Sequence, residues 1–385
     1  MSRRIATDED QSASFVELFF DLAFVFAVTQ IVQVIHHHLA WADVGRGLVL
    51  FWLVWWAWTQ FAWALNSADT THPGVESAML AATATSIAMA VAIPTSFADA
   101  GLWFASTYVL VRTIGLAIYS RVAWEHPDKR LPLRRFIVLS VPGLIAVVAG
   151  GATAGDGRVW WWATAVGLDI VAATLAGSSD GWDIRPAHFG ERHGLFVIIA
   201  LGESLIVAGS GLSTESNTAA LFAGAAALAT TCSLWWLYFT NVKPRLEHAI
   251  EPRVGADRAG TSRDVYSILH FLILFGVVLI AVAVEEAVTN PSGPLTSGAR
   301  LALAAGLLLF IGGAYAALAR VGYRPTMVGL ALLITSAGGV LLVRPPDAAW
   351  TLLAAATGAA LLATVGTATE RARDRLIDGP LGQIG

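Results

Sequence analysis

The stretch "FVELFFDLAFVFAVTQIVQVI" at residues 15–35 decides the fold class of this chain. It is about as long as a helix that crosses a bilayer, and most of its side chains are apolar. Glu17 and Asp21 interrupt it, one helical turn and about 6 Å apart on the same face. A charge at the centre of a membrane helix costs about 2.5–3.5 kcal/mol, so these carboxylates are candidates for a functional role.

The composition of the whole chain is that of an integral membrane protein. Of 385 residues, 56% are hydrophobic and 14% are charged, and the mean hydropathy is +0.64. Soluble domains carry about 25% charged residues. The net charge of −4 does not predict a nucleic-acid partner, and the single Cys232 excludes an intramolecular disulfide. The N-terminal segment "MSRRIATDEDQSAS" lacks the apolar core of a signal peptide.

Apolar runs separated by short polar loops predict an all-α integral membrane protein with about twelve transmembrane helices. Helices are expected because lipid tolerates no unpaired backbone and because the runs are too long for barrel strands. The predicted spans lie near residues 15–38, 46–65, 77–97, 101–120, 134–151, 158–177, 193–211, 217–240, 265–288, 298–319, 326–343 and 348–367.

The placement of basic residues supports this count and predicts an orientation. With a cytoplasmic N-terminus, nineteen of the 24 Lys and Arg residues fall in cytoplasmic segments. The outer loops contain four: Arg46, Arg158, Arg300 and Arg344. Such an excess is typical of cytoplasmic loops. We therefore expect a multi-pass protein of a bacterial inner membrane with both termini in the cytoplasm.

The two halves of the chain resemble each other weakly. "WLVWWAWTQ" in the second span is similar to "SLWWLYFTN" in the eighth, and "AVAIP" ending the third span is similar to "AVAVE" in the ninth. The matches keep their order, which predicts two six-helix repeats, at residues 1–178 and 179–385. Because six is an even number, the repeats would share one orientation in the membrane.

Each polar residue inside a span has a structural and a functional interpretation. Glu17 fits a first-turn carboxylate that complements the helix dipole, whereas Asp21 lies deeper. Glu203, near the bilayer midplane in "ALGESLIVAG", is a candidate proton carrier or a partner of Arg112. The more economical partner of Arg112 is Asp169, in a structural ion pair.

Tryptophan and histidine are also unusual in this chain. Among fifteen Trp residues, Trp55 and Trp58 lie deep in the second span, one expected on each side of the helix, and either line a cavity or pack in the core. Aromatic walls suit cationic or polyprenyl-like ligands. "HHH" at 36–38 favours an interfacial cluster over a metal site, because consecutive helical residues point 100° apart.

Two segments stand out by their polar residues, "FVELFFDLAFVFAVTQI" at 15–31 and "HFGERHGLFVIIALGESLIVAG" at 188–209. Together they resemble the two signature segments of the bacterial low-temperature-requirement protein A family. The resemblance covers nearly the whole chain and implies a multi-pass inner-membrane protein, but no general biochemical activity. The family pattern falls here on Glu17, Phe19, Asp21, Gln30, Glu191, Arg192, His193, Gly194, Gly202, Glu203 and Ser204.

Three classes of function remain open. A proton-coupled transporter would use carboxylates along a path through the membrane. A membrane enzyme would use a buried acid on an isoprenoid-like substrate in a Trp-lined pocket. A structural, lipid-interacting protein needs no such chemistry. The first two predict reactive side chains at Asp21, Glu203, Glu17 and His193, converging on one cavity, and substrate contacts at Trp55, Gln60, Arg192 and His270, with Arg192 and His270 at its cytoplasmic rim.

The expected partners are membrane lipid and a small-molecule or lipid-like substrate. Neither a cofactor nor a metal is predicted, since the sequence has no Cys cluster, aspartate-rich diphosphate motif or glycine-rich phosphate loop. The sequence indicates no oligomeric state.

Overall fold

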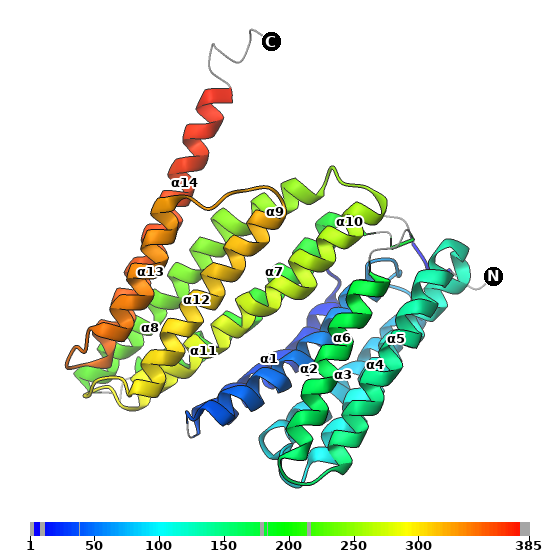
Figure 1. The fold of residues 1–385 in the computed structure, drawn as a ribbon, viewed down its shortest axis with the longest axis horizontal. Helices are drawn as coiled ribbons and strands as arrows, with labels where there is room; N and C mark the ends of the chain where they lie inside the picture. Colours follow the sequence, from blue (N-terminus) through cyan, green and yellow to red (C-terminus); the bar gives the residue numbers. More distant parts are fainter. Residues whose placement is uncertain are drawn as a thin grey trace. The chain divides into compact units, whose positions relative to one another are not determined.

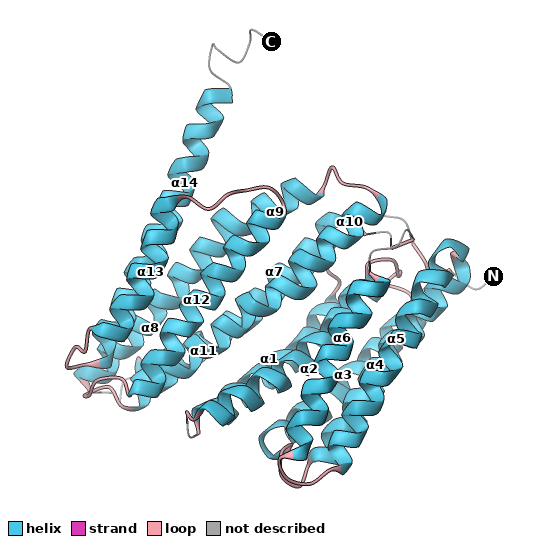
Figure 2. Cartoon of the chain, in the orientation of Figure 1, coloured by secondary structure: helices cyan, strands magenta, loops and turns pink. Residues whose placement is uncertain are grey.

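The structure, a computed structural model, consists of helices joined by loops in its described part (Figures 1 and 2). It describes residues 4–7, 12–37, 39–177, 181–182, 184–213 and 217–377. The α-helices are α1 (Phe15–His36), α2 (Trp41–Leu65), α3 (Pro73–Ala92), α4 (Gly101–Glu125), α5 (Pro127–Ala152), α6 (Gly157–Ala176), α7 (Pro186–Gly211), α8 (Thr218–Leu237), α9 (Lys243–Ile250), α10 (Gly255–Ser262), α11 (His270–Thr289), α12 (Ser297–Arg320), α13 (Met327–Leu342) and α14 (Ala348–Ile377). Three short segments are a 3-10 helix, η1 (Ile93–Thr95), and two π-helices, η2 (Tyr238–Val242) and η3 (Arg263–Leu269).

The all-α prediction is confirmed, and the predicted spans coincide with helices. In the described residues, eleven helices are long and apolar enough to cross a membrane. Thr218–Ile250 is one of these, formed by α8, η2 and α9, and Gly255–Thr289 is another, formed by α10, η3 and α11. The predicted span at 326–343 is the 16-residue α13. It would be about 24 Å long, shorter than the hydrocarbon core of about 30 Å, so the count of twelve stays a prediction.

The chain forms two compact units. The N-terminal unit contains Met1–Glu203 and Ala249–Val278, and the C-terminal unit contains Ser204–His248 and Leu279–Gly385. The border between them passes through α7 and α11. The predicted boundary between the two sequence repeats, between residues 178 and 179, lies outside the described residues. The division into two repeats stays a prediction.

In the N-terminal unit, α2 is the central helix. It contacts α1, α4 and α6, and 89% of its most apolar window is buried. Around it, α1 packs on α3, α3 on α4, α4 on α5, and α5 on α6 (Figure 1). Because the middle of α2 is covered on several sides, its Trp and Gln side chains there face protein rather than lipid, whereas Trp41 at the start of α2 is 76% exposed. Trp55, Trp58 and Gln60 are all buried.

In the C-terminal unit, α14 packs on α8 and α13, and α13 packs on α12. Small residues allow the close approach of α8 to the end of α7. A Cβ added at Gly224 would lie 2.9 Å from the Ala208 carbonyl oxygen. Such glycine and alanine contacts are typical of helix packing in membranes.

Candidate functional site

A buried ion cluster joins the N-terminal parts of α1 and α7. Arg192 Nη1 lies 3.0 Å from Glu17 Oε1, and Arg192 Nη2 donates to Asp21 Oδ1 at 2.8 Å. The exposed fractions of Glu17, Asp21 and Arg192 are 0%, 2% and 0%. One guanidinium therefore bridges both carboxylates of the first span. We call Glu17, Asp21, Trp58, His188 and Arg192 the Arg192 cluster.

Local chemistry at the start of α1 fixes the position of Glu17. Glu17 is the third residue of the helix, and its Oε2 accepts from the backbone N–H of Ser14 at 2.8 Å and from Ser14 Oγ at 2.9 Å. This arrangement caps the first turn, where free N–H groups favour a carboxylate. Glu17 thus caps the helix, as its structural interpretation predicts, and it also forms an ion pair with Arg192.

His188 and Trp58 complete the Arg192 cluster. His188 Nε2 lies 3.3 Å from Glu17 Oε1, and His188 Nδ1 lies 3.4 Å from Asn66 Nδ2. Trp58 Nε1 donates to Asp21 Oδ1 at 2.8 Å, and the Arg192 guanidinium carbon lies 5.5 Å from the centre of the Trp58 ring. Trp58 therefore contacts both charges of the Arg192–Asp21 pair, by a hydrogen bond and by cation–π attraction.

The charges of the Arg192 cluster do not balance. Two ionised carboxylates beside one guanidinium and a neutral His188 would leave one uncompensated negative charge in the membrane, which is expensive. The cluster is neutral when it binds one additional proton. Asp21 Oδ2 is buried and has no hydrogen-bond partner in the described part of the chain, so it is the oxygen open to a proton or a donor.

Glu203 lies deeper on α7 and contacts α1 at a second point. Thr29 Oγ1 donates to Glu203 Oε2 at 2.5 Å. The side chain of Glu203 is buried, and it is eleven residues, about 16 Å, along α7 from Arg192. Helices α1 and α7 therefore share two polar contacts at different depths.

An aromatic layer of Phe24, Trp55, Trp58 and Phe196 lies between these two polar contacts. Phe24 falls between Asp21 and Thr29 on α1, and its ring centre is 6.3 Å from that of Phe196 on α7. The Phe196 ring is 5.1 Å from Trp55 and 4.6 Å from Trp58.

The prediction of Trp55 and Trp58 on opposite sides of α2 is wrong. Three residues span 300° of rotation, which leaves the side chains 60° apart, and the two rings stack at 5.1 Å.

Two buried histidines, His193 and His270, lie beside the aromatic layer. Their ring centres are 5.8 Å apart, and Tyr266 lies within 5.0 Å of both. The Nδ1 atoms of His193 and His270 lie 2.8 Å from the carbonyl oxygens of Phe189 and Val265. The π-helix η3 shifts the backbone register here, and the Ser267 carbonyl accepts from Trp55 Nε1 at 2.8 Å. Such π-helical segments occur often at functional sites.

A second buried ion pair lies on the other side of α2. Arg112 Nη1 is 3.5 Å from Asp169 Oδ1 and donates to Tyr108 Oη at 2.8 Å. Arg112 Nε donates to Gln60 Oε1, and Gln60 Nε2 donates to the Arg112 carbonyl at 2.8 Å. The predicted pairing of Arg112 with Asp169 is confirmed. Because Arg112 occupies both ends of the Gln60 amide, this geometry favours a structural role for Gln60.

We expect Asp169→Asn to lower the melting temperature of the purified protein. The change leaves the Arg112 guanidinium buried without a carboxylate, and breaking a buried pair costs about 3–5 kcal/mol. The contacts with Gln60 and Tyr108 favour the lower end of that range. The double variant Arg112→Met with Asp169→Leu should recover most of the loss. Equal melting curves for the Asp169→Asn variant and the wild type would contradict a structural ion pair.

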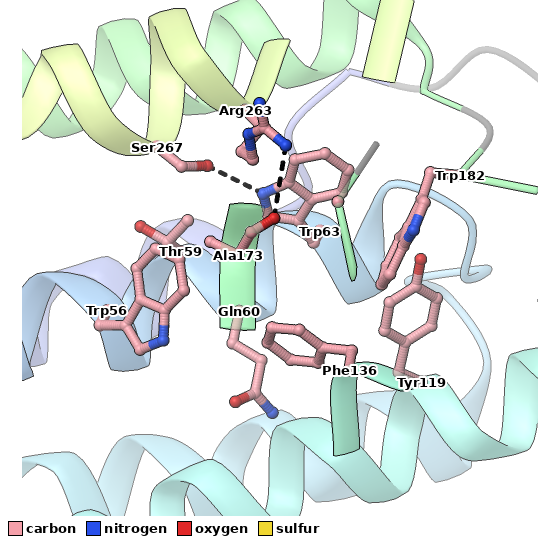
Figure 3. Close-up of a pocket in the computed structure, with 11 residues that line it drawn as sticks. Trp56, Thr59, Gln60, Trp63, Tyr119, Phe136, Ala173, Trp182, Arg263 and Ser267 are labelled. Carbon is pink, nitrogen blue, oxygen red and sulfur yellow. Dashed lines mark hydrogen bonds between the residues drawn. The ribbon is translucent and has the colours of Figure 1, made fainter. Parts of the chain in front are cut away.

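A pocket of about 40 Å³ lies beside the Arg112 pair (Figure 3). Its lining includes Trp56, Gln60, Trp63, Trp182 and Arg263. Trp63 Nε1 donates to Ser267 Oγ at 3.0 Å, and Arg263 Nη1 donates to the Ala173 carbonyl at 3.4 Å (Figure 3). This volume is large enough for a few water molecules, whereas substrate pockets measure about 300–1,000 Å³. Neither Asp21 nor Glu203 lines it, so the alternative of an acid catalyst in a Trp-lined pocket finds no support.

The structure joins some of the predicted site residues and separates others. Glu17 and Asp21 meet at Arg192, which is fully buried between them. His193 is buried against the rings of Trp55 and Trp58, His270 is buried beside His193, and Glu203 is eleven residues along α7 from Arg192. The proton-carrying and substrate-binding roles stay predictions. In the described residues there is no group of three or more His, Cys, Asp or Glu residues that could hold a metal, and His38 of the "HHH" segment lies outside them.

Three residues that take part in these buried contacts, His188, Thr29 and Tyr266, are not among the residues predicted from the sequence. His188 belongs to "HFGERH", four residues before Arg192, so helical spacing could have placed both on one face of α7. Thr29 follows Asp21 by eight residues, which is also close to a whole number of turns. Tyr266 carried no such signal, because its position depends on the π-helical register of η3.

These features define a multi-pass helical membrane protein with buried ion pairs between its spans. The chain matches the family model described as bacterial low temperature requirement A protein over residues 12–365, and it belongs to that family. It is also similar to the uncharacterized protein RA0937 of Rhizobium meliloti strain 1021, with 28% identity over 325 residues, which cover 81% of this chain and 78% of the relative. No solved structure matches it significantly.

Proposed function

We propose that this protein is a proton-coupled secondary transporter of the inner membrane. The observation that carries the proposal is the charge imbalance of the Arg192 cluster, which needs one proton to be neutral. Buried ionisable residues of this kind mark proton relays in transport proteins. The two polar contacts between α1 and α7 supply positions for a proton at different depths, and the aromatic layer between them limits the passage of water.

In this mechanism, Asp21 holds the exchangeable proton. When Asp21 is ionised, it binds Arg192 and Trp58 through Oδ1; when it is protonated, its attraction for Arg192 falls. Arg192 then remains paired with Glu17 alone, and the contact between α1 and α7 weakens on one side. The protein would thus have two states, with a tighter and a weaker contact between α1 and α7, and proton binding would shift the equilibrium between them. His193 and Glu203 would pass the proton onward. Trp55 and His270 would contact the substrate, a small or lipid-like molecule.

The proposal includes a duplicated architecture. The proposed repeat pairs α2 with α8, α4 with α12, α5 with α13 and α6 with α14. Within the N-terminal unit α2 contacts α6, α4 contacts α5, and α5 contacts α6; within the C-terminal unit α8 contacts α14, α12 contacts α13, and α13 contacts α14. These three neighbour pairs recur in both sets, whereas the contact of α2 with α4 has no comparable counterpart between α8 and α12. The three recurring pairs support parallel repeats of the kind found in secondary transporters.

The proposed topology has twelve spans and two cytoplasmic termini, and reporter fusions test it. A reporter fused at residue 212 is expected to be periplasmic, and one fused at residue 255 cytoplasmic, because the basic segment 241–264 lies on the inner side. A fusion at residue 324 provides an internal control and should also be cytoplasmic. The opposite result at 212 or 255 would reject the orientation.

Transport itself can be tested with the full-length protein in liposomes that contain a pH-sensitive dye. A panel of small solutes is added outside, and solute-dependent changes of the internal pH are recorded. We expect at least one solute to produce a change that the Asp21→Asn variant does not produce. Solute uptake that continues unchanged after the pH gradient has been collapsed, or that is unchanged in the variant, would reject proton coupling.

A further inference from the structure

A groove between α4 and α5 combines positive charge with apolar walls. Its volume is about 240 Å³. Its lining comes from the end of α4 and the first half of α5, and none of it is acidic: Ser120, Ala123, Trp124, Arg130, Leu133, Arg134, Ile137 and Val138. Trp124 is 71% exposed, as expected of an aromatic residue at a membrane–water interface.

The two arginines of the groove differ in their contacts. Arg130 donates to the carbonyl oxygens of Ala123 and Trp124, at 3.1 Å and 2.5 Å, and lies 5.5 Å from the centre of the Trp124 ring. It therefore satisfies free carbonyl groups near the end of α4. Arg134 is exposed, and it has neither a hydrogen bond nor an ion pair with any described residue. Arg134 is thus the cation that remains available to an anion in the groove.

An apolar stripe on α5 continues from the groove. Val138, Val141, Ile145 and Val148 follow one another at helical spacing, and they are 61%, 44%, 62% and 42% exposed. Val138 and Val148 are ten steps apart, or about 15 Å along the helix axis, which is comparable to much of an acyl chain. A cationic pocket at the interface and an apolar stripe beneath it together match the shape of a phospholipid.

We propose that this groove binds an anionic phospholipid, with its phosphate at Arg134 and one acyl chain along the α5 stripe. Arginine forms charge-assisted hydrogen bonds with phosphate, and basic pockets beside membrane helices bind anionic headgroups. The choice of a lipid over a free phosphate rests on the apolar walls and the α5 stripe, which a soluble anion would not contact. The site is separate from the Arg192 cluster and does not depend on the transport proposal.

Thermal unfolding of the full-length protein in a neutral detergent tests this site. Phosphatidylglycerol is added to the wild type and to Arg134→Gln, and the concentration that gives half of the maximal rise in melting temperature is measured. Loss of one charge-assisted contact is expected to raise this concentration roughly tenfold. Arg135→Gln is the matched control, because Arg135 is a neighbouring exposed arginine that does not line the groove.

Two comparisons separate the lipid from other sources of the effect. Phosphatidylcholine and glycerol phosphate should each raise the melting temperature much less than phosphatidylglycerol, since one lacks the net charge and the other lacks the chains. An equal response of Arg134→Gln and the wild type to phosphatidylglycerol would overturn the proposal. So would an equal effect of glycerol phosphate, which would indicate binding of the phosphate group alone.

Discussion

Arg192→Gln is expected to remove most of the folded protein from the membrane fraction. The change leaves Glu17 and Asp21 buried near each other without their shared cation. Removing one partner of a buried ion pair costs about 3–5 kcal/mol, which is a large part of the 5–15 kcal/mol that stabilises a typical domain. The yield of detergent-soluble protein and its melting temperature measure the effect.

Two further variants distinguish the loss of the ion pair from the loss of the side chain itself. Arg192→Gln combined with Glu17→Gln leaves a single carboxyl group, which can be neutralised by one proton, so the double variant should recover much of the yield. Arg192→Lys keeps the charge but cannot present two nitrogens to two carboxylates, and an intermediate stability is expected. A melting temperature of Arg192→Gln equal to that of the wild type would show that the cluster contributes no ion pairing.

Asp21→Asn and Glu203→Gln are expected to abolish solute-dependent proton movement while the protein still folds. The amide cannot exchange a proton, but it costs less to bury than a charged carboxylate. Trp58 Nε1 and Arg192 Nη2 can still donate to the Asn oxygen at position 21. Growth of a strain lacking the native protein, complemented by each variant, provides a cellular readout, and membrane yield is the control.

The outcomes assign different roles to the two acids. If both variants have wild-type activity at normal yield, neither acid carries a proton and the structural interpretation holds. If only Glu203→Gln fails, then Glu203 is functional and Asp21 serves the ion cluster. Thr29→Val, which removes the contact with Glu203 and keeps both acids, should reduce the rate of transport without abolishing it.

The helices and one ion pair could be predicted from the sequence for simple physical reasons. Lipid imposes long apolar runs, so the spans are visible as composition, and their loops as clusters of charge. Because few charges lie within the spans, the partners available to Arg112 reduce to Asp169, the more economical choice, and Glu203. The number of spans is not settled by the sequence, because α13 has 16 residues, which is just below the usual minimum of about 17 for a span.

The arrangement within the site was much less predictable. The sequence places Glu17 and Asp21 on one face of α1, but it does not indicate that Arg192 lies between them, which depends on how α7 meets α1. Stacking of Trp55 on Trp58 follows from helical rotation, which places residues three apart only 60° from each other, so the sequence contains this information. The position of Tyr266 depends on η3, and a π-helical turn has no clear signature in a single sequence.

Infrared difference spectroscopy of the full-length protein, recorded between alkaline and acidic pH, tests the one-proton Arg192 cluster most directly. It needs no substrate, because a protonated carboxyl group has its own carbonyl stretching band. Every carboxyl group that titrates in this range contributes to the spectrum, so the comparison with variants carries the test. The predicted result is a reversible carboxyl band that is lost in Asp21→Asn and retained in Asp169→Asn. A spectrum of Asp21→Asn identical to that of the wild type in this region would contradict a proton held at Asp21.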